Sequence, residues 1–238
     1  MGKLEGKVAL VTGAGRGIGR AIAEQLMEEG AYTFLVARRG EALRKLAKLS
    51  QAKGHRAEAL RADISRERDV KNLFLAVRER AKRLHILVNN AGVFTYKPFL
   101  KTTFADWRKN IETNLTGTFL CTRAAVPLMG QGPGHVVNIL SVAGREAYAK
   151  CSAYCASKFG ARGLTKVLAE ELRPRGIRVT GVLPGPVDTG MLKEFDFPIR
   201  RERVLRPEDV ARAVLEVLTQ PERASLEEIV LRPSSGSF

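Results

Sequence analysis

The segment CSAYCASK, residues 151–158, places two pairs of reactive side chains on one short stretch. Tyr154 and Lys158 are four residues apart, and so are Cys151 and Cys155. A free phenol has a pKa of about 10 and a nearby ammonium favours the phenolate, so the first pair could exchange protons with a substrate. On a helix, residues four apart share one face. The two thiols could instead form a metal or redox site.

The cysteines do not fit a metal or disulfide framework. The chain holds three, Cys121, Cys151 and Cys155, which are too few and too unevenly spaced for a disulfide scaffold. The three histidines lie far apart in the sequence, and no second CxxC or HxxxH motif supplies further ligands. We therefore predict no metal site. We expect Cys155, turned about 100° from Tyr154 on the helix, to face the scaffold, and leave open whether Cys151 contacts substrate.

A glycine-rich turn, VTGAGRGIG at residues 11–19, is expected to bind phosphate. It joins a predicted strand to a predicted helix, and the first turn of a helix offers N–H groups and the positive end of its dipole. Glycine is needed there because a β-carbon would block the approach of a pyrophosphate. The glycines that fit are Gly13, Gly17 and Gly19, in the spacing G-x-x-x-G-x-G. The predicted cofactor contacts in this turn are Gly13, Gly15, Arg16, Gly17, Ile18 and Gly19.

The second predicted strand ends in arginines instead of the acid that an NAD-binding fold requires. An Asp or Glu at this position would accept hydrogen bonds from the ribose hydroxyls. Here the sequence continues Arg38-Arg39, and Arg16 lies in the glycine turn. A carboxylate would repel a 2′-phosphate, whereas a guanidinium binds it through two charge-assisted hydrogen bonds. The sequence therefore predicts NADP(H) over NAD(H); the alternative is that both arginines simply begin a solvated helix.

Short apolar runs alternate with amphipathic helical stretches along the chain. Strands are predicted at 7–12, 32–37, 56–63, 85–91, 135–141, 177–184 and 227–233, and helices at 15–30, 41–54, 66–83, 103–129, 153–173 and 207–220. Strands of near-continuous Val, Ile and Leu are typical of a parallel sheet covered by helices on both faces. We predict one α/β domain over residues 1–238, a Rossmann-like, doubly wound, seven-stranded and mostly parallel sheet. Its ligands should bind at the carboxyl ends of the strands.

The composition is that of a soluble enzyme, with 45% hydrophobic and 27% charged residues. No run of about 18 apolar residues predicts a membrane span, and the N-terminal sequence lacks the apolar core of a signal peptide, so we expect a cytoplasmic protein. The formal net charge is +15 at pH 7. The basic residues are interleaved with acids on the predicted helices, which is typical of solvated helix faces and does not favour nucleic acid as a partner.

These motifs occur in an order that resembles the short-chain dehydrogenase/reductases over nearly the whole chain. They are TGAGRGIG at 12–19, Asp63 after the third strand, NNAG at 89–92, Asn114, Ser141, YCASK at 154–158 and PGPVDT at 184–189. Tyr154 follows Ser141 by thirteen positions, which is a family-like spacing. The resemblance implies an NADP(H)-preferring oxidoreductase of the carbonyl reductase type.

The resemblance also implies roles for individual residues. Tyr154 would give a proton to the carbonyl oxygen, or take it in reverse, while Lys158 would tune the phenol and hold the nicotinamide ribose. Ser141 would hydrogen-bond the substrate oxygen, and Asn114 would hold a relay water near Lys158. Asp63 is expected to contact the adenine. The remaining residues implied to contact the cofactor are Ile64, Asn90, Ala91, Gly92, Pro184, Gly185, Val187 and Thr189.

The segment 185–206 is expected to be a short substrate flap, because it is irregular and follows a predicted strand. It offers the apolar side chains Met191, Leu192, Phe195, Phe197 and Ile199. These favour an apolar or mixed carbonyl substrate unless they serve only as packing contacts. The predicted substrate contacts are Ser141, Arg145, Tyr154 and Met191.

More than one activity fits this pattern. The main prediction is NADP(H)-dependent interconversion of a ketone or aldehyde and its alcohol. The alternative is reduction of 3-oxoacyl groups on an acidic carrier protein, which the charge of +15 would suit. Two alternatives are not enzymes. A basic nucleic-acid-binding protein on the same fold would explain the positive charge, and a cofactor sensor without turnover would explain the cofactor-binding motifs. The resemblance implies a homo-oligomer, a dimer or a tetramer, in which the helices that carry Asn114 and Tyr154 could form one of the interfaces.

Overall fold

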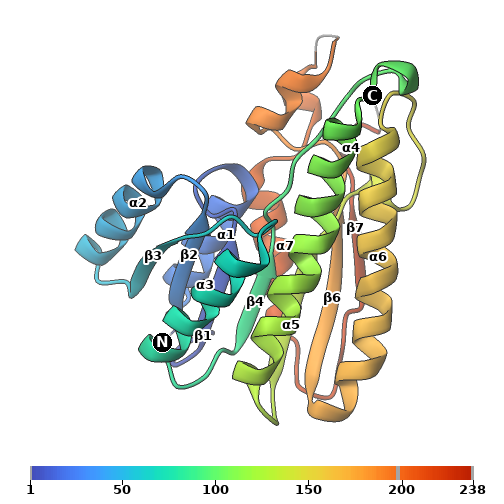
Figure 1. The fold of residues 1–238 in the computed structure, drawn as a ribbon. Coiled ribbons are helices and arrows are strands. Elements are labelled where there is room, and N and C mark those ends of the chain that lie inside the picture. The colour runs from blue at the N-terminus through green and yellow to red at the C-terminus, as the bar shows by residue number, and fades with distance from the viewer. Residues whose placement is uncertain (1, 197–198, 237–238) are drawn as a thin grey trace.

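A central parallel sheet is built from the apolar runs that the sequence predicts as strands (Figure 1). The computed structural model describes residues 2–196 and 199–236. The strands are β1 (Val8–Thr12), β2 (Tyr32–Ala37), β3 (Ala57–Arg61), β4 (Ile86–Asn89), β5 (Gly134–Ile139), β6 (Ile177–Pro184) and β7 (Glu228–Leu231). Their order is β3-β2-β1-β4-β5-β6-β7, and every neighbouring pair is parallel. The predicted Rossmann-like, seven-stranded sheet is confirmed.

Helices cover both faces of this sheet. One apolar core is shared by α1 (Gly17–Glu28), α2 (Gly40–Ala52) and α7 (Pro207–Leu218), and the other by α3 (Glu67–Arg80), α5 (Gly117–Met129) and α6 (Ser152–Leu172). Within β1, Leu10 belongs to one core and Val11 to the other, because successive side chains of a strand point to opposite faces. None of the helices in the described part of the chain has the length and apolar character needed to cross a membrane.

The order of the strands determines where a ligand can bind at the edge of the sheet. The chain runs outward from β1 through β2 to β3 and then returns to the opposite side of β1, where β4 pairs with it. The connections that leave β1 and β4 therefore pass to opposite faces of the sheet and leave a crevice at the carboxyl ends of the strands. Thr12 ends β1 just before the glycine turn, and Asn89 ends β4 just before Asn90.

The predicted helix at 103–129 consists of three elements. These are α4 (Phe104–Asn110), a π-helical turn η2 (Ile111–Thr116), and α5, which contains Pro127 in its last turn. A π-helical turn adds residues to the helix without interrupting it, so the apolar pattern still looks helical from the sequence. Such turns are frequent at functional sites, and this one carries Asn114.

The other elements differ from the prediction mainly at their ends. β3 was predicted two residues longer toward its carboxyl end, and β7 was predicted to continue past Leu231. Several short 3₁₀ turns were not predicted, since three to five residues carry no periodic signal. They are η1 (Phe99–Lys101), η3 (Val142–Gly144), η4 (Arg173–Arg175), η5 (Gly190–Glu194) and η6 (Arg201–Arg203).

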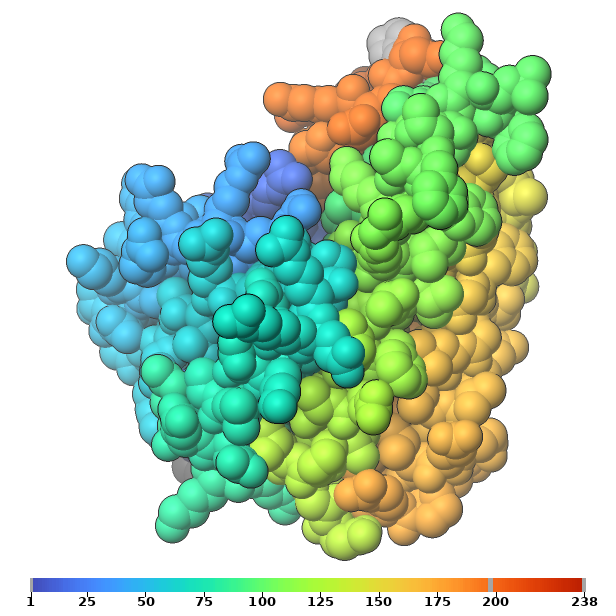
Figure 2. Space-filling view, in the orientation of Figure 1, coloured from blue at the N-terminus to red at the C-terminus, as the bar shows by residue number. Residues whose placement is uncertain are grey.

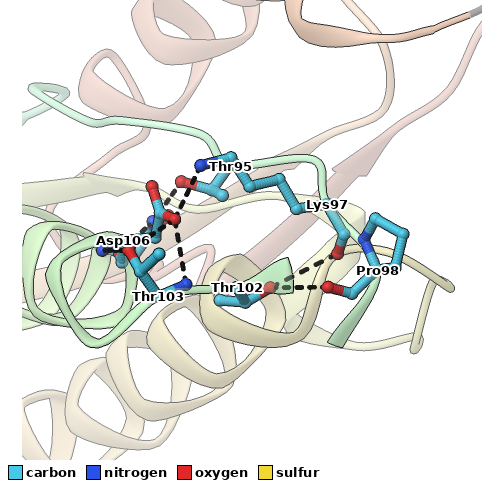
Figure 3. A network of polar contacts seen from close by, with 7 residues as sticks. Thr95, Lys97, Pro98, Thr102, Thr103 and Asp106 are labelled. Carbon is cyan, nitrogen blue, oxygen red and sulfur yellow. Dashed lines mark hydrogen bonds and ion pairs between the residues drawn. The ribbon is translucent and has the colours of Figure 1, made fainter. Parts of the chain in front are cut away.

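A polar network at the start of α4 fixes the loop that leaves β4 (Figure 3). Thr103 Oγ1 accepts from the Asp106 N–H at 3.1 Å, and the Asp106 carboxylate accepts from the Thr103 N–H at 3.1 Å, which is a capping box. Lys97 Nζ lies 2.7 Å from the same carboxylate. Asn110 Nδ2 donates to Thr95 Oγ1 at 2.8 Å. The loop after β4 is thus tied to α4 at two points.

The predicted flap, 185–206, is an irregular segment whose ends are tied together. Val187 and Leu205 form an isolated parallel bridge, and the Asp188 N–H donates to Leu205 O at 2.7 Å. Residues 197–198 of the prediction, including Phe197, lie outside the described residues. Figure 2 shows the orange flap beside the green segment near residue 100, above an indentation of the surface that the blue N-terminal segment borders.

Candidate active site

Asn90, just after β4, holds the glycine turn in place. Its Nδ2 donates to Thr12 O at 2.9 Å, and Thr12 Oγ1 accepts from the N–H groups of Asn90 and Ala91, both at 3.0 Å. A β-carbon at Gly13, where φ is +70°, would lie 2.7 Å from Asn90 Nδ2, and one at Gly19 would overlap the same amide. The close approach of the two segments therefore requires glycine at both positions.

The N-terminus of α1 opens onto this turn without a side-chain cap. The helix begins at Gly17, its N-cap Arg16 makes no side-chain capping bond, and its first turn holds no acid. The first N–H groups of the helix are therefore left to bind a ligand, and the helix dipole favours an anion there. This arrangement fits the diphosphate of a dinucleotide.

Three arginines line the neighbouring end of the cavity. Arg38 and Arg39 follow β2, and Arg16 lies in the glycine turn. Arg39 is also the N-cap of α2 and makes no side-chain capping bond, so a second helix N-terminus adds donors beside the guanidinium groups. Guanidinium groups bind phosphate bidentately. This end of the cavity fits a phosphorylated ribose.

Asp63 and Ile64 lie after β3 and form a further part of the cavity wall. Asp63 Oδ1 accepts from the Ser65 N–H at 3.1 Å and from Ser65 Oγ at 2.7 Å, while the Asp63 N–H donates to Asp69 Oδ2 at 3.0 Å. These bonds fix the direction of the Asp63 carboxyl group. Its place beside the arginine end is compatible with the predicted contact to an adenine.

Ser141, Tyr154 and Lys158 meet at the other end of the cavity. Ser141 follows β5 and caps η3, where its Oγ accepts from the Ala143 N–H at 3.1 Å, and its hydroxyl also hydrogen-bonds the Tyr154 phenol. Lys158 lies one turn along α6 from Tyr154 and donates from Nζ to Ile139 O at 2.9 Å. Its Nζ is 5.8 Å from the centroid of the Tyr154 ring. The spacing in YCASK thus brings both groups to one face, as predicted.

Gly144 permits the close packing of η3 on α6. A β-carbon at this position would lie 2.8 Å from Lys158 O. Gly144 is a site residue that was not predicted from the sequence. Its position three residues after Ser141 is the signal that could have indicated close packing there. Any larger residue would push Ser141 away from the helix that carries Tyr154.

Asn114 holds the loop after β4 against α6. Its Oδ1 accepts from the Val93 N–H at 2.8 Å, and its Nδ2 donates to Val93 O and to Ser157 Oγ, both at 2.9 Å. The side chain is buried and is not among the described residues that line the cavity. Its hydrogen bonds make Asn114 a positioning residue here. The predicted role in holding a relay water stays a prediction.

A cavity of about 1510 Å³ joins the arginine end to the tyrosine end. The predicted residues that line it are Gly13, Gly15, Arg16, Gly17, Ile18, Gly19, Arg38, Arg39, Asp63, Ile64, Asn90, Ala91, Gly92, Ser141, Tyr154, Lys158, Pro184, Gly185, Val187, Thr189 and Met191. Arg145 is not among the described lining residues, because it follows η3 with its side chain exposed. Its position does not favour the predicted contact with substrate.

Several lining residues were not predicted from the sequence. Phe94 and Tyr96 leave β4 just after the NNAG motif, so their place at a carboxyl end of the sheet was a usable signal. Arg232 and Pro233 follow β7, also at a carboxyl end, and Arg232 forms an ion pair with Glu146. The sequence carries no local sign of that pairing.

The family model for short chain dehydrogenases matches residues 7–197. The chain belongs to the short-chain dehydrogenase family. A sepiapterin reductase from Chlorobaculum tepidum is 38% identical to this chain, and the alignment covers 97% of this chain and 98% of the relative. A short chain dehydrogenase from Burkholderia cenocepacia in complex with NADP has a TM-score of 0.90 and 32% identity, covering 98% and 99% of the two chains. A metagenomic short-chain oxidoreductase in complex with NADP has a TM-score of 0.85 and 36% identity, with the same coverage.

Cys151 and Cys155 pack in one cluster with Tyr154. Cys151 is the N-cap of α6 and lines the cavity, whereas Cys155 packs with Ala143 and Tyr154 and is not among the described lining residues. A hydrogen bond between the two thiols raises the pKa of Cys151 and lowers the pKa of Cys155. No cluster of three metal-binding side chains is found in the described part of the chain. Contact between Cys151 and a substrate stays a proposal.

Burial shifts the pKa values of both Tyr154 and Lys158. It raises the pKa of Tyr154 to about 12, although the hydrogen bond from Ser141 acts in the opposite direction. It also lowers the pKa of Lys158 to about 8. From the sequence we expect the Lys158 ammonium to lower the pKa of Tyr154. The structure gives the opposite net shift, because Lys158 Nζ lies over the ring and bonds Ile139 O while the phenol is buried.

We expect Tyr154 in the dehydrogenase without ligand to ionise only well above its ordinary pKa of 10.0. Ser141→Ala should raise this pKa further, because the substitution removes a hydrogen bond that stabilises the phenolate. The chain holds four tyrosines, so their ring-carbon NMR signals can be followed against pH and assigned with Tyr154→Phe. A Tyr154 pKa at or below 10.0 would contradict the dominance of burial.

Proposed function

We propose that this protein uses NADP(H) to interconvert a ketone or an aldehyde and the corresponding alcohol, as an oxidoreductase acting on CH–OH and C=O groups. The observation that carries the proposal is one cavity lined by the glycine turn, the three arginines and the set Ser141, Tyr154 and Lys158. When bound, NADPH would supply the hydride that reduces the carbonyl carbon. The NADP complexes of the two solved relatives support the cofactor, and the name of the Chlorobaculum relative supports a reductase.

Ser141 and Tyr154 would act on the carbonyl oxygen. Negative charge develops on this oxygen as the carbon is reduced, and the Ser141 hydroxyl would stabilise it by donating a hydrogen bond. Tyr154 would then give its proton to the oxygen. The phenol is protonated near neutral pH, as a proton donor in the reducing direction must be, and burial makes it a weaker acid than a free phenol. Lys158 would hold the nicotinamide ribose from the same helix.

The other end of the cavity would hold the adenosine half of NADP(H). The turn from Gly13 to Gly19 and the start of α1 would bind the diphosphate. Arg16, Arg38 and Arg39 would bind the 2′-phosphate. The segment Pro184–Thr189 lies after β6 on the cavity wall and would contact the nicotinamide.

The preference for NADPH over NADH should depend on Arg38 and Arg39. We expect replacing both by Ala to lower the ratio of the two kcat/KM values by roughly tenfold to a hundredfold, the range for losing charged hydrogen bonds. Arg44→Ala is the matched control, since Arg44 lies nearby on α2 but is not among the described lining residues. Equal kcat/KM for NADPH and NADH in the unmodified protein would overturn the cofactor assignment.

Tyr154→Phe should reduce turnover by about 10²–10⁴-fold, the range for removing a general acid–base group. NADPH binding, measured by the change in its fluorescence, should stay within about twofold because the ring is retained. Tyr148→Phe is the matched control: Tyr148 also lines the cavity, but its hydroxyl bonds Glu146 at 2.8 Å. A Tyr154→Phe variant with full turnover would refute the mechanism.

We also propose that the protein forms a homo-oligomer through the outer face of α4, η2, α5 and α6. On this face Phe119, Phe159 and Val167 are 42%, 45% and 52% exposed, and Phe104 on α4 is 74% exposed. Large apolar side chains gathered on one surface favour coverage by a protein partner. A second copy of the chain would cover them by presenting the same face.

Sedimentation velocity tests this assembly. We expect the unmodified protein to sediment as a dimer or a tetramer and Phe159→Glu to shift it toward monomer, since the buried charge would be unpaired. Leu49→Glu is the control, because Leu49 is 52% exposed on α2, away from this face. A monomeric unmodified protein would contradict the proposal.

A further inference from the structure

Aromatic rings from two distant segments gather around the Tyr154 phenol. Phe94 packs edge-on against Tyr154, with ring centroids 4.8 Å apart and ring planes at 85°. Phe195 lies 5.1 Å from Phe94 and 5.0 Å from Tyr96, centroid to centroid. Phe94, Tyr96 and Phe195 all line the cavity, and we call these three residues the aromatic collar.

The aromatic collar joins the flap to the loop after β4. Phe94 and Tyr96 belong to that loop, and Phe195 directly follows η5 in the flap. Tilted or edge-on rings 4.5–7 Å apart attract one another through their quadrupoles. The collar therefore holds the flap down over the end of the cavity where Tyr154 lies.

Lys150 fastens the same two segments together. Its Nζ lies 2.6 Å from Asp196 Oδ2 in the flap and 5.1 Å from the centroid of the Tyr96 ring. Its carbonyl oxygen accepts from the Lys97 N–H at 2.8 Å. Lys150 has φ +65°, a left-handed conformation that is costly for a residue with a β-carbon. The contacts of Lys150 thus join the flap to the loop after β4 and offset the cost of its backbone conformation.

The loop side of the collar is anchored independently of the flap. Lys97 Nζ pairs with Asp106 at 2.7 Å, and Asp106 belongs to the capping box of α4 (Figure 3). Asn114 holds both backbone groups of Val93, the residue before Phe94. The rings of the loop are thus fixed before any substrate enters.

The surroundings of the collar are mainly apolar, with Lys193 of the flap as a charged residue on the same cavity wall. Cys151, Met191 and Leu192 line the cavity near it. Arg232, which also reaches this part of the cavity, forms an ion pair with Glu146. What the collar itself presents to a substrate is the faces and edges of aromatic rings.

We propose that the aromatic collar selects substrates whose reactive carbonyl is attached directly to a flat aromatic ring, namely aryl ketones and aryl aldehydes. This inference rests on the proposed function, which places the carbonyl oxygen at Ser141 and Tyr154. Conjugation keeps such a carbonyl in the plane of its ring. With the oxygen at Tyr154, the ring would lie beside Phe94, with Tyr96 next to it on the loop side and Phe195 covering it from the flap side. A saturated ring of equal size is thicker and has no quadrupole to pair with the collar.

A matched pair of ketones tests the selection: acetophenone, and cyclohexyl methyl ketone as its saturated counterpart. We expect kcat/KM with NADPH to be about tenfold higher for acetophenone, and Phe195→Leu to remove most of that difference. The saturated ketone should change by less than about twofold in the same variant, and Phe195→Tyr, which keeps a ring, should retain the selectivity. Phe99→Leu is the control, since Phe99 is 76% exposed on η1.

The outcomes separate this inference from the proposed function. Equal kcat/KM for the two ketones, or a higher value for an acetoacetyl thioester than for both, would overturn the collar while leaving the oxidoreductase intact. If no carbonyl consumes NADPH, the proposed function fails. Calorimetry on the protein saturated with NADP⁺ then decides the collar alone: tighter binding of acetophenone than of its saturated counterpart supports it, and equal or absent binding overturns it.

Discussion

The hydrogen bond from the Asn90 amide to Thr12 O joins the carboxyl ends of β1 and β4, the two strands at which the order of the sheet reverses. Glycine at positions 13 and 19 lets these segments approach. On the β1 side this hydrogen bond fixes the position of the glycine turn that leads into α1. On the β4 side it sets the start of the loop that leads to Phe94. One contact thus orders both the proposed phosphate end and the proposed substrate end of the cavity.

At the end of the cavity opposite the arginines, the burial of Tyr154 connects the acidity of its phenol to the choice of substrate. The pKa of Tyr154 is raised because its phenol is removed from water, and Phe94 is one of the rings that cover it. Phe195 brings the flap onto the same cluster. Phe94, which helps to bury the phenol, would therefore also contact a substrate ring. A change in the aromatic collar is expected to alter both the pKa of Tyr154 and the choice of substrate. A change at the arginine end should alter neither the pKa nor the choice of substrate.

The sequence predicted the parts of the molecule that depend on local residue types. Near-continuous apolar runs gave the parallel sheet, and the residues at strand ends, such as Arg38 and Ser141, gave most of the cavity wall. It could not predict the π-helical turn at Asn114, because a single turn of this kind inside a helical region is too short to show a period of its own. Nor could it pair Phe195 with Phe94, because a contact between distant segments has no local signature. The pKa of Tyr154 likewise depends on burial in the folded chain.

We propose that this cavity brings a carbonyl carbon to the hydride of NADPH while Tyr154 supplies the proton to its oxygen. The most direct test uses NADPH that carries deuterium at both hydrogen positions of the nicotinamide carbon that donates hydride, together with an aryl ketone, and analyses the alcohol by mass spectrometry. We expect one deuterium on the carbinol carbon of the alcohol. An alcohol without deuterium, or no alcohol from any carbonyl compound supplied with NADPH, would contradict it.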